Sequence, residues 1–133
     1  MVTITDAYLE ELSDLAVGDS DKELHVLKVG SGTGSEGTGS SGLTTVEYES
    51  DKDNTDVKFI DQGTGEYEAR IDVTAGGTTA NVPADTSITE IGVFHTAPDG
   101  SNETLAIVDN SFSAVTIPAG NTERFKIPID HTR

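Results

Sequence analysis

Short segments in which every second residue is apolar recur along this 133-residue chain, and they limit its fold more than any other feature. The clearest is EYEARIDVTA, residues 66–75. Successive side chains of a β-strand point to opposite faces, so this alternation predicts a strand with one buried face and one face in water. The expected inward residues are Tyr67, Ala69, Ile71 and Val73, and the expected outward residues are Glu66, Glu68, Arg70, Asp72 and Thr74.

Further segments of this kind follow one another at intervals of about ten residues. They cover 23–29, 43–49, 56–61, 78–83, 87–96, 104–109, 113–118 and 122–129. Turn residues separate them, and the letters DQGTGE between 58 and 67 predict a hairpin. Because no helices lie between these segments, the sequence predicts an all-β protein, an antiparallel β-sandwich or jelly-roll-like fold of eight to nine short strands.

Residues 5–17 have helical spacing instead. Thr5 or Asp6 can cap a helix here, and Gly18 can end it. The residues expected on its apolar face are Tyr8, Leu9, Leu12, Leu15 and Ala16. We predict an N-terminal helix or arm over 1–22, packed against a sheet or a neighbouring subunit, and a single sandwich domain over 23–133.

The charge balance excludes several classes of function. The chain has 24 acidic and 8 basic residues, a net charge of −16, and such a surface repels nucleic acid. Acidic residues along the whole chain, few lysines and no tryptophan favour a protein from concentrated salt, where like charges are screened. The sequence lacks a basic, apolar leader and a run of about 18 apolar residues, so we expect neither a cleaved signal nor membrane insertion.

The glycine-rich stretch VGSGTGSEGTGSSG, residues 29–42, contains the spacing G-x-G-x-x-G at Gly32, Gly34 and Gly37. A dinucleotide site needs a helix directly after these glycines, so that its N-terminal amides hold the pyrophosphate. Here a predicted strand follows, and no G-K-[ST] is present for a P-loop. The stretch therefore predicts a mobile, solvated loop.

Other residue types give no catalytic pattern. His25, His95 and His131 are far apart and lack metal-ligand spacing, so His25 and His95 are expected to be half-exposed strand residues. Cysteine is absent, no serine lies in G-x-S-x-G, and no carboxylate pair stands out. We predict that the chain is not an enzyme and assign no catalytic, cofactor-binding or metal-binding residues.

Calcium is the one cofactor that the acidic loops suggest. Residues 19–23 (DSDKE) and 51–56 (DKDNTD) alternate oxygen ligands as calcium loops do. Both lack the glycine at the sixth position and the glutamate at the twelfth, so solvated acidic loops are expected instead.

The segment TSITEIGVF, residues 86–94, carries two local predictions. Ile88, Ile91 and Val93 cannot all share one face of a regular strand, so a bulge or burial on both sides is expected near 89–90. Gly92 predicts close approach of another backbone or a bulky side chain.

This segment, the Gly-containing loop after it, the strand ending FSAV, the IPAG turn and the closing amphipathic strand together form a recognisable layout over 86–129. It resembles that of small structural proteins encoded in the virion gene clusters of tailed phages and haloarchaeal tailed viruses. The upstream VGSGTG loop is similar to the early GTG loop of such proteins, so the resemblance covers roughly 24–129. The helix over 5–17 has no counterpart in it.

The resemblance implies a virion structural protein: a decoration, cement or turret protein on the head surface that binds the major capsid protein or other virion proteins as a homo-oligomer, a trimer or a pentamer. The helix or the 30–42 loop would supply the docking arm. A tail or baseplate protein is the alternative. A carbohydrate- or calcium-dependent binding module of a halophilic surface protein is a further reading, weakened by the absence of tryptophan and the presence of only three tyrosines.

Overall fold

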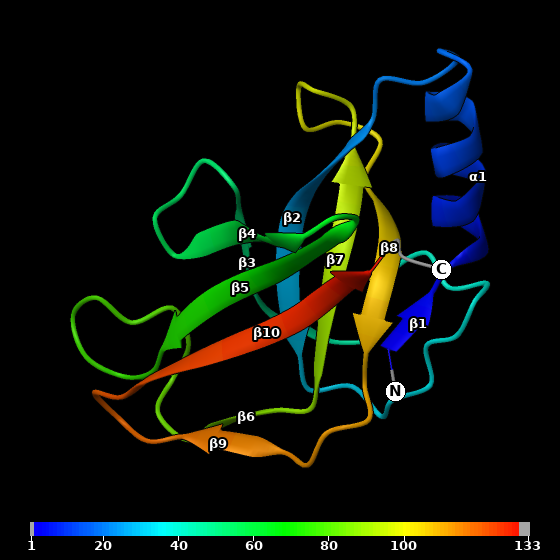
Figure 1. Ribbon diagram of the computed structural model, residues 1–133. Coiled ribbons are helices and arrows are strands. Elements are labelled where there is room, and N and C mark those ends of the chain that lie inside the picture. The colour runs from blue at the N-terminus through cyan, green and yellow to red at the C-terminus, as the bar shows by residue number, and fades with distance from the viewer. Residues whose placement is uncertain (1, 131–133) are drawn as a thin grey trace.

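The computed structural model describes residues 2–130, which form two main antiparallel sheets, one short helix and a small third sheet (Figure 1). In chain order the elements are β1 (Val2–Ile4), α1 (Asp6–Ala16), β2 (Glu23–Gly30), β3 (Val46–Asp51), β4 (Val57–Gly63), β5 (Glu66–Thr74), β6 (Thr86–Ile88), β7 (Glu90–Thr96), β8 (Thr104–Asp109), β9 (Val115–Ile117) and β10 (Thr122–Asp130). The strand orders are β1-β8-β7-β2-β3, β10-β5-β4 and β6-β9.

This arrangement confirms the predicted all-β antiparallel sandwich with one N-terminal helix. Residues 2–130 form ten strands rather than eight or nine, because β1 precedes the helix and the segment predicted at 87–96 divides at Thr89. The strand predicted at 78–83 is absent: only Val82 bridges to Ala75. Gly76 and Gly77, both with positive φ, turn the chain just before it.

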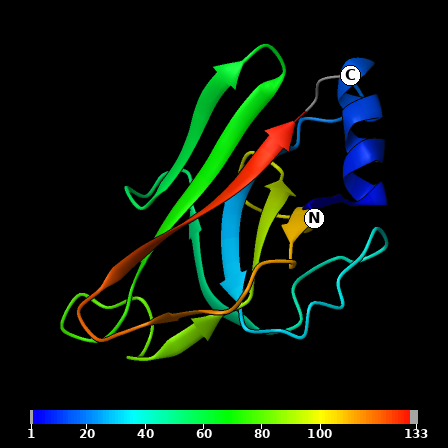
Figure 2. The same ribbon diagram turned by 60° about the horizontal axis from the view of Figure 1, so that its bottom comes forward.

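The core lies between the five-stranded and three-stranded sheets, which Figure 2 shows as separate layers. Ala69, Ile71 and Val73 of β5 are fully buried, as their alternation predicted. Tyr67 is 44 % exposed, so its predicted inward position is wrong. It is the second residue after the β4–β5 turn, near the end of the hairpin, although its cross-strand partner Ile129 is buried in the core.

The irregularity predicted near residues 89–90 is the point at which the chain leaves the small β6–β9 sheet and enters the five-stranded sheet. β6 pairs with β9, whereas β7 begins at Glu90 and pairs with β2 and β8. Every residue of β7 is buried, because the sheet is covered on both faces at this strand. Gly92 is needed here, since a Cβ at this position would lie 2.8 Å from Cδ1 of Leu105.

Helix α1 is capped by Thr5, whose Oγ1 accepts a hydrogen bond from the Tyr8 amide at 3.2 Å and donates to the Leu105 carbonyl at 2.7 Å. Tyr8 is buried and Leu12 packs against the core. Leu9 and Leu15 are exposed, so only part of the predicted apolar face is covered. Within residues 2–130, no helix is long and apolar enough to cross a membrane.

Candidate functional site

The first glycines of the 29–42 stretch lie over a buried carboxyl group. Glu90 begins β7 and is fully buried. A Cβ at Gly30 would lie 2.7 Å from its Oε1, and one at Gly32 would lie 2.5 Å from the same atom. The Gly32 amide donates to this oxygen at 3.2 Å. These glycines therefore make room for a glutamate about 60 residues away in sequence.

A second glutamate from the same stretch completes the site. Glu36 is nearly buried, and its Oε1 accepts from both the amide and the hydroxyl of Thr44 at 2.8 Å. The side-chain amide of Asn110 donates to Oε2 of Glu36 at 3.3 Å. The carboxyl groups of Glu36 and Glu90 are close enough to influence each other's ionisation. We call Glu36 and Glu90 the carboxyl pair.

The pKa values of the two members of the carboxyl pair are shifted in opposite directions from the usual value of a glutamate. Burial, followed by the neighbouring carboxyl group of Glu36 and its negative charge, raises the pKa of Glu90 to about 7. Burial opposes ionisation of Glu36, but the neighbouring carboxyl group of Glu90 and hydrogen bonds from Thr44 outweigh it and lower the pKa of Glu36 to about 2. Oε2 of Glu90 is buried and has no hydrogen-bond partner within residues 2–130. The raised pKa of Glu90 and the lowered pKa of Glu36 place the proton of the pair on Glu90.

Split carboxyl pKa values can serve acid–base catalysis, but Glu90 is fully buried and Glu36 is 9 % exposed. The pair instead fastens the first half of the glycine stretch to the sheet, so the predicted solvated position is wrong for Gly32 and Glu36, which are buried, whereas residues 31 and 33–35 are exposed as predicted. A Cβ at Gly37, Gly39 or Gly42 would meet only open space. No helix follows the stretch.

Two of the three histidines are buried, contrary to the half-exposed positions predicted for them. His95 on β7 packs its ring against Tyr8, with ring centroids 6.0 Å apart, and burial lowers its pKa. His25 on β2 is also buried and lies beside Asp51 and Asp53. The alternation of apolar residues could not predict that these two histidines are buried. Residues outside their own strands cover them: α1 covers His95, and the residues around His25 cover His25. His131 lies outside the described residues.

The two acidic loops differ in their surroundings. Asp51 and Asp53, from the 51–56 loop, come within 4.8 Å of a ring nitrogen of His25, measured between potential ligand atoms. Within the described residues, the 19–23 loop forms no such group. The DKD alternation at residues 51–53 was a sequence signal for the two aspartates of this cluster. The histidine lies on β2, which is far from this loop in sequence although it pairs with β3.

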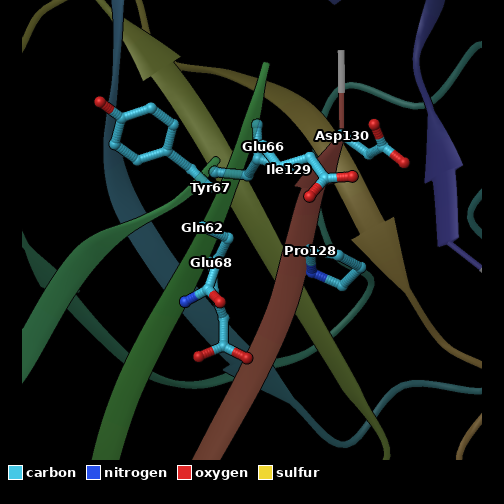
Figure 3. A pocket seen from close by; sticks show the side chains of 7 residues that line it. All are labelled: Gln62, Glu66, Tyr67, Glu68, Pro128, Ile129 and Asp130. Carbon is cyan, nitrogen blue, oxygen red and sulfur yellow. The ribbon is translucent and has the colours of Figure 1, made fainter. Parts of the chain in front are cut away.

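The cavities at the surface are acidic or neutral. A hollow of about 270 Å³ lies where β5 begins and β10 ends. In Figure 3 the Tyr67 ring lies on one side of it and Asp130 on the other. Its lining is Gln62, Glu66, Tyr67, Glu68, Pro128, Ile129 and Asp130. A larger polar hollow of about 480 Å³ includes Tyr48, whose hydroxyl is already bonded to Asp56. A third, of about 330 Å³, is lined by Val2, Ile4, Ile107, Pro128 and Asp130.

Five of the seven basic residues within residues 2–130 form ion pairs with carboxylates. The ion pairs are Lys22 with Glu11, Lys28 with Glu49 and Glu103, Lys52 with Glu23, Arg70 with Glu68, and Arg124 with Asp72. Lys58 and Lys126 lie opposite Arg70 on the neighbouring strands β4 and β10, which makes a short row of three basic residues across the three-stranded sheet.

Exposed apolar side chains gather on α1. Leu9 is 52 %, Leu15 41 % and Val17 71 % exposed, and these are three of the five large apolar residues exposed in the described chain. At about 100° per residue, Leu9 and Val17, the C-cap residue of α1, lie about 80° apart around the helix axis, whereas Leu15 lies about 160° from Val17. We therefore call Leu9 and Val17 the uncovered helix face.

Comparison of the chain with protein-family models, with curated proteins and with solved structures found no match to any of them.

Proposed function

We propose that the chain is a structural protein of the particle of a haloarchaeal tailed virus, where it decorates the head by binding the major capsid protein as a homo-oligomer. The layout of residues 86–129 supports this proposal, and the antiparallel sandwich described above is the fold that such a layout implies. The acidic surface supports a source in concentrated salt.

The uncovered helix face carries the proposal. The sheet covers Tyr8 and Leu12 but leaves Leu9 and Val17 in water. Burying apolar surface stabilises by about 25 cal/mol per Å², so a partner that covers this face gains binding energy. A decoration protein works in this way, by adding buried area between copies and to the shell beneath them.

The charge on α1 makes this contact dependent on salt. Asp6, Glu10, Glu11 and Asp14 lie on the same helix, so two copies that approach through it repel each other in dilute buffer. The Debye length falls to about 3 Å at 1 M salt, which removes most of this repulsion. We expect the oligomer to form in molar KCl and to dissociate in dilute buffer.

Sedimentation velocity in molar KCl tests the proposal. The wild-type chain should sediment as a trimer or a pentamer, and Leu9→Glu combined with Val17→Glu should give a monomer with unchanged circular dichroism. Val46→Glu is the matched control: Val46 is a comparably exposed apolar residue on β3, at the opposite edge of the five-stranded sheet from α1. This control should leave the oligomer intact.

A wild-type monomer that binds a glycan in molar KCl would overturn the proposal and favour a binding module. Location in the particle has a separate test. A pull-down with the major capsid protein of the same virus should retain the wild-type chain and lose the Leu9→Glu/Val17→Glu variant. Retention by a tail or baseplate protein instead would reject the head location.

A further inference from the structure

The cluster of His25, Asp51 and Asp53 is positioned by an irregularity in β2. The β2–β7 pairing skips His25, since Leu24 pairs with His95 and Val26 pairs with Phe94. A residue left over in this way forms a bulge, which redirects its side chain. On the other side of β2, Val26 pairs with Asp51, the last residue of β3. Chain topology thus brings His25 beside the turn that follows β3.

The His25 ring is buried, incompletely hydrogen-bonded and directed by Nε2 toward Asp53. It is only 8 % exposed, and its buried Nδ1 has no hydrogen-bond partner within residues 2–130. Buried polar atoms in folded proteins are nearly always hydrogen-bonded. Nδ1 lies 3.6 Å from Oε1 of Glu23, and Nε2 lies 3.9 Å from Oδ2 of Asp53. Both separations exceed a hydrogen bond.

The carboxylates are ready to act as ligands. One oxygen of Asp51 accepts from the Asp53 amide at 2.9 Å and from the Asn54 side chain at 3.2 Å, which fixes its orientation and leaves the other oxygen for an ion. The Asp53 side chain is 77 % exposed and can rotate. Ligand atoms around tetrahedral zinc lie about 3.4 Å apart, so the cluster must contract by at most about 1.4 Å.

We propose that His25, Asp51 and Asp53 bind a divalent transition-metal ion such as zinc, with water completing the coordination. Glu23 orients His25: a proton on Nδ1 directed to Glu23 leaves the lone pair of Nε2 toward Asp53, the arrangement that carboxylates give to metal-binding histidines. Lys52 balances the charge of Glu23 through a contact of 2.5 Å. Neutral imidazole with two carboxylates then matches the charge of a divalent cation.

The donor set selects the class of ion. Calcium and magnesium take oxygen ligands and gain little from imidazole, whereas zinc, manganese, cobalt and nickel accept it readily. The bound ion would link the beginning of β2 to the β3–β4 turn. This inference does not depend on the proposed virion role, because it concerns a single copy of the chain.

Calorimetric titration of untagged, chelator-treated protein with zinc chloride in molar KCl tests the site. Molar salt screens the non-specific attraction of cations to an acidic surface, so coordination dominates the signal. We expect one zinc per chain. His25→Gln and Asp53→Asn should each weaken affinity more than a hundredfold, and Glu23→Gln should weaken it about 10–100-fold.

Asp85→Asn is the matched control, since Asp85 is an exposed carboxylate beside β6 and asparagine tolerates its positive φ of 63°. It should bind zinc like wild type. Asp53→Asn changes an exposed side chain and should retain the wild-type circular dichroism. Absence of saturable zinc binding, undiminished affinity in Asp53→Asn, or displacement of zinc by equimolar calcium would each overturn the proposal.

Discussion

Replacing Glu90 with glutamine should remove a pH dependence that the carboxyl pair builds into the stability of this protein. Glutamine has the shape of a protonated glutamate, keeps an acceptor for the Gly32 amide and can donate to Glu36. The variant therefore imitates the state of the pair with one proton. Unlike Glu90, it cannot release that proton as pH rises.

The magnitude follows from the pKa of Glu90, which folding raises from 4.5 to about 7. A group whose pKa is raised by folding contributes stability fully below its unfolded pKa, and that contribution is lost as pH rises through its folded pKa. The free energy of unfolding of the wild type should thus fall by about 3 kcal/mol between about pH 4.5 and pH 7 on account of Glu90. Glu90 is fully buried, so solvent screening reduces this figure little.

Urea unfolding in molar KCl, repeated from about pH 5 to about pH 8, measures the effect. The stability difference between Glu90→Gln and wild type should grow by about 2–3 kcal/mol across this range in favour of the variant. Because burial lowers the pKa of His95, its contribution has the opposite slope and is lost as pH falls. That contribution is common to both proteins and cancels in the difference.

Glu10→Gln changes an exposed glutamate of α1 and serves as the matched control, which should keep the wild-type slope. The reasoning about the carboxyl pair is refuted if the Glu90→Gln difference stays constant between pH 5 and pH 8. It is refuted equally if Glu10→Gln abolishes the slope.

Three further predictions use the same unfolding assay. Gly32→Ala should cost more than about 2 kcal/mol because its Cβ would lie 2.5 Å from Oε1 of Glu90, whereas Gly37→Ala, in open space, should change stability by less than about 1 kcal/mol; equal costs would contradict the packing described for this stretch. Thr5→Ala should cost about 1–2 kcal/mol through loss of the helix cap and of the bond to Leu105, and an unchanged midpoint would count against that cap. Transfer from molar to about 0.1 M KCl should destabilise the protein, since 24 acidic residues face only 8 basic ones, and greater stability in dilute buffer would contradict adaptation to salt.

Much of the fold could be predicted because its strands have locally visible patterns. The alternation in β5 identified Ala69, Ile71 and Val73 as core residues, and all three are fully buried. The hairpin between β4 and β5 and the close approach at Gly92 were also predicted correctly. Each of these features depends on residues near one another in sequence or on the residue type itself.

The carboxyl pair could not be predicted in this way. In a strand pattern Glu90 is an ordinary polar residue, and its burial depends on glycines some 60 positions earlier. The surroundings of His25 could not be predicted either, because its neighbours Asp51 and Asp53 come from the end of β3 and the turn that follows it. A period-two pattern reports which face a residue occupies, but not what the rest of the chain places over that face.

The pairing of β1 with β8 has a consequence for the order of assembly. Val2 lies opposite Asp109, and Thr5 bonds to the backbone around Leu105, so residues 2–5 find their partners only after segments about a hundred positions later have been synthesised. Contacts of such long range are formed slowly. During translation, α1 therefore emerges with its apolar side undocked, and a nascent chain interrupted before residues 104–109 would offer that side to chaperones or to aggregation.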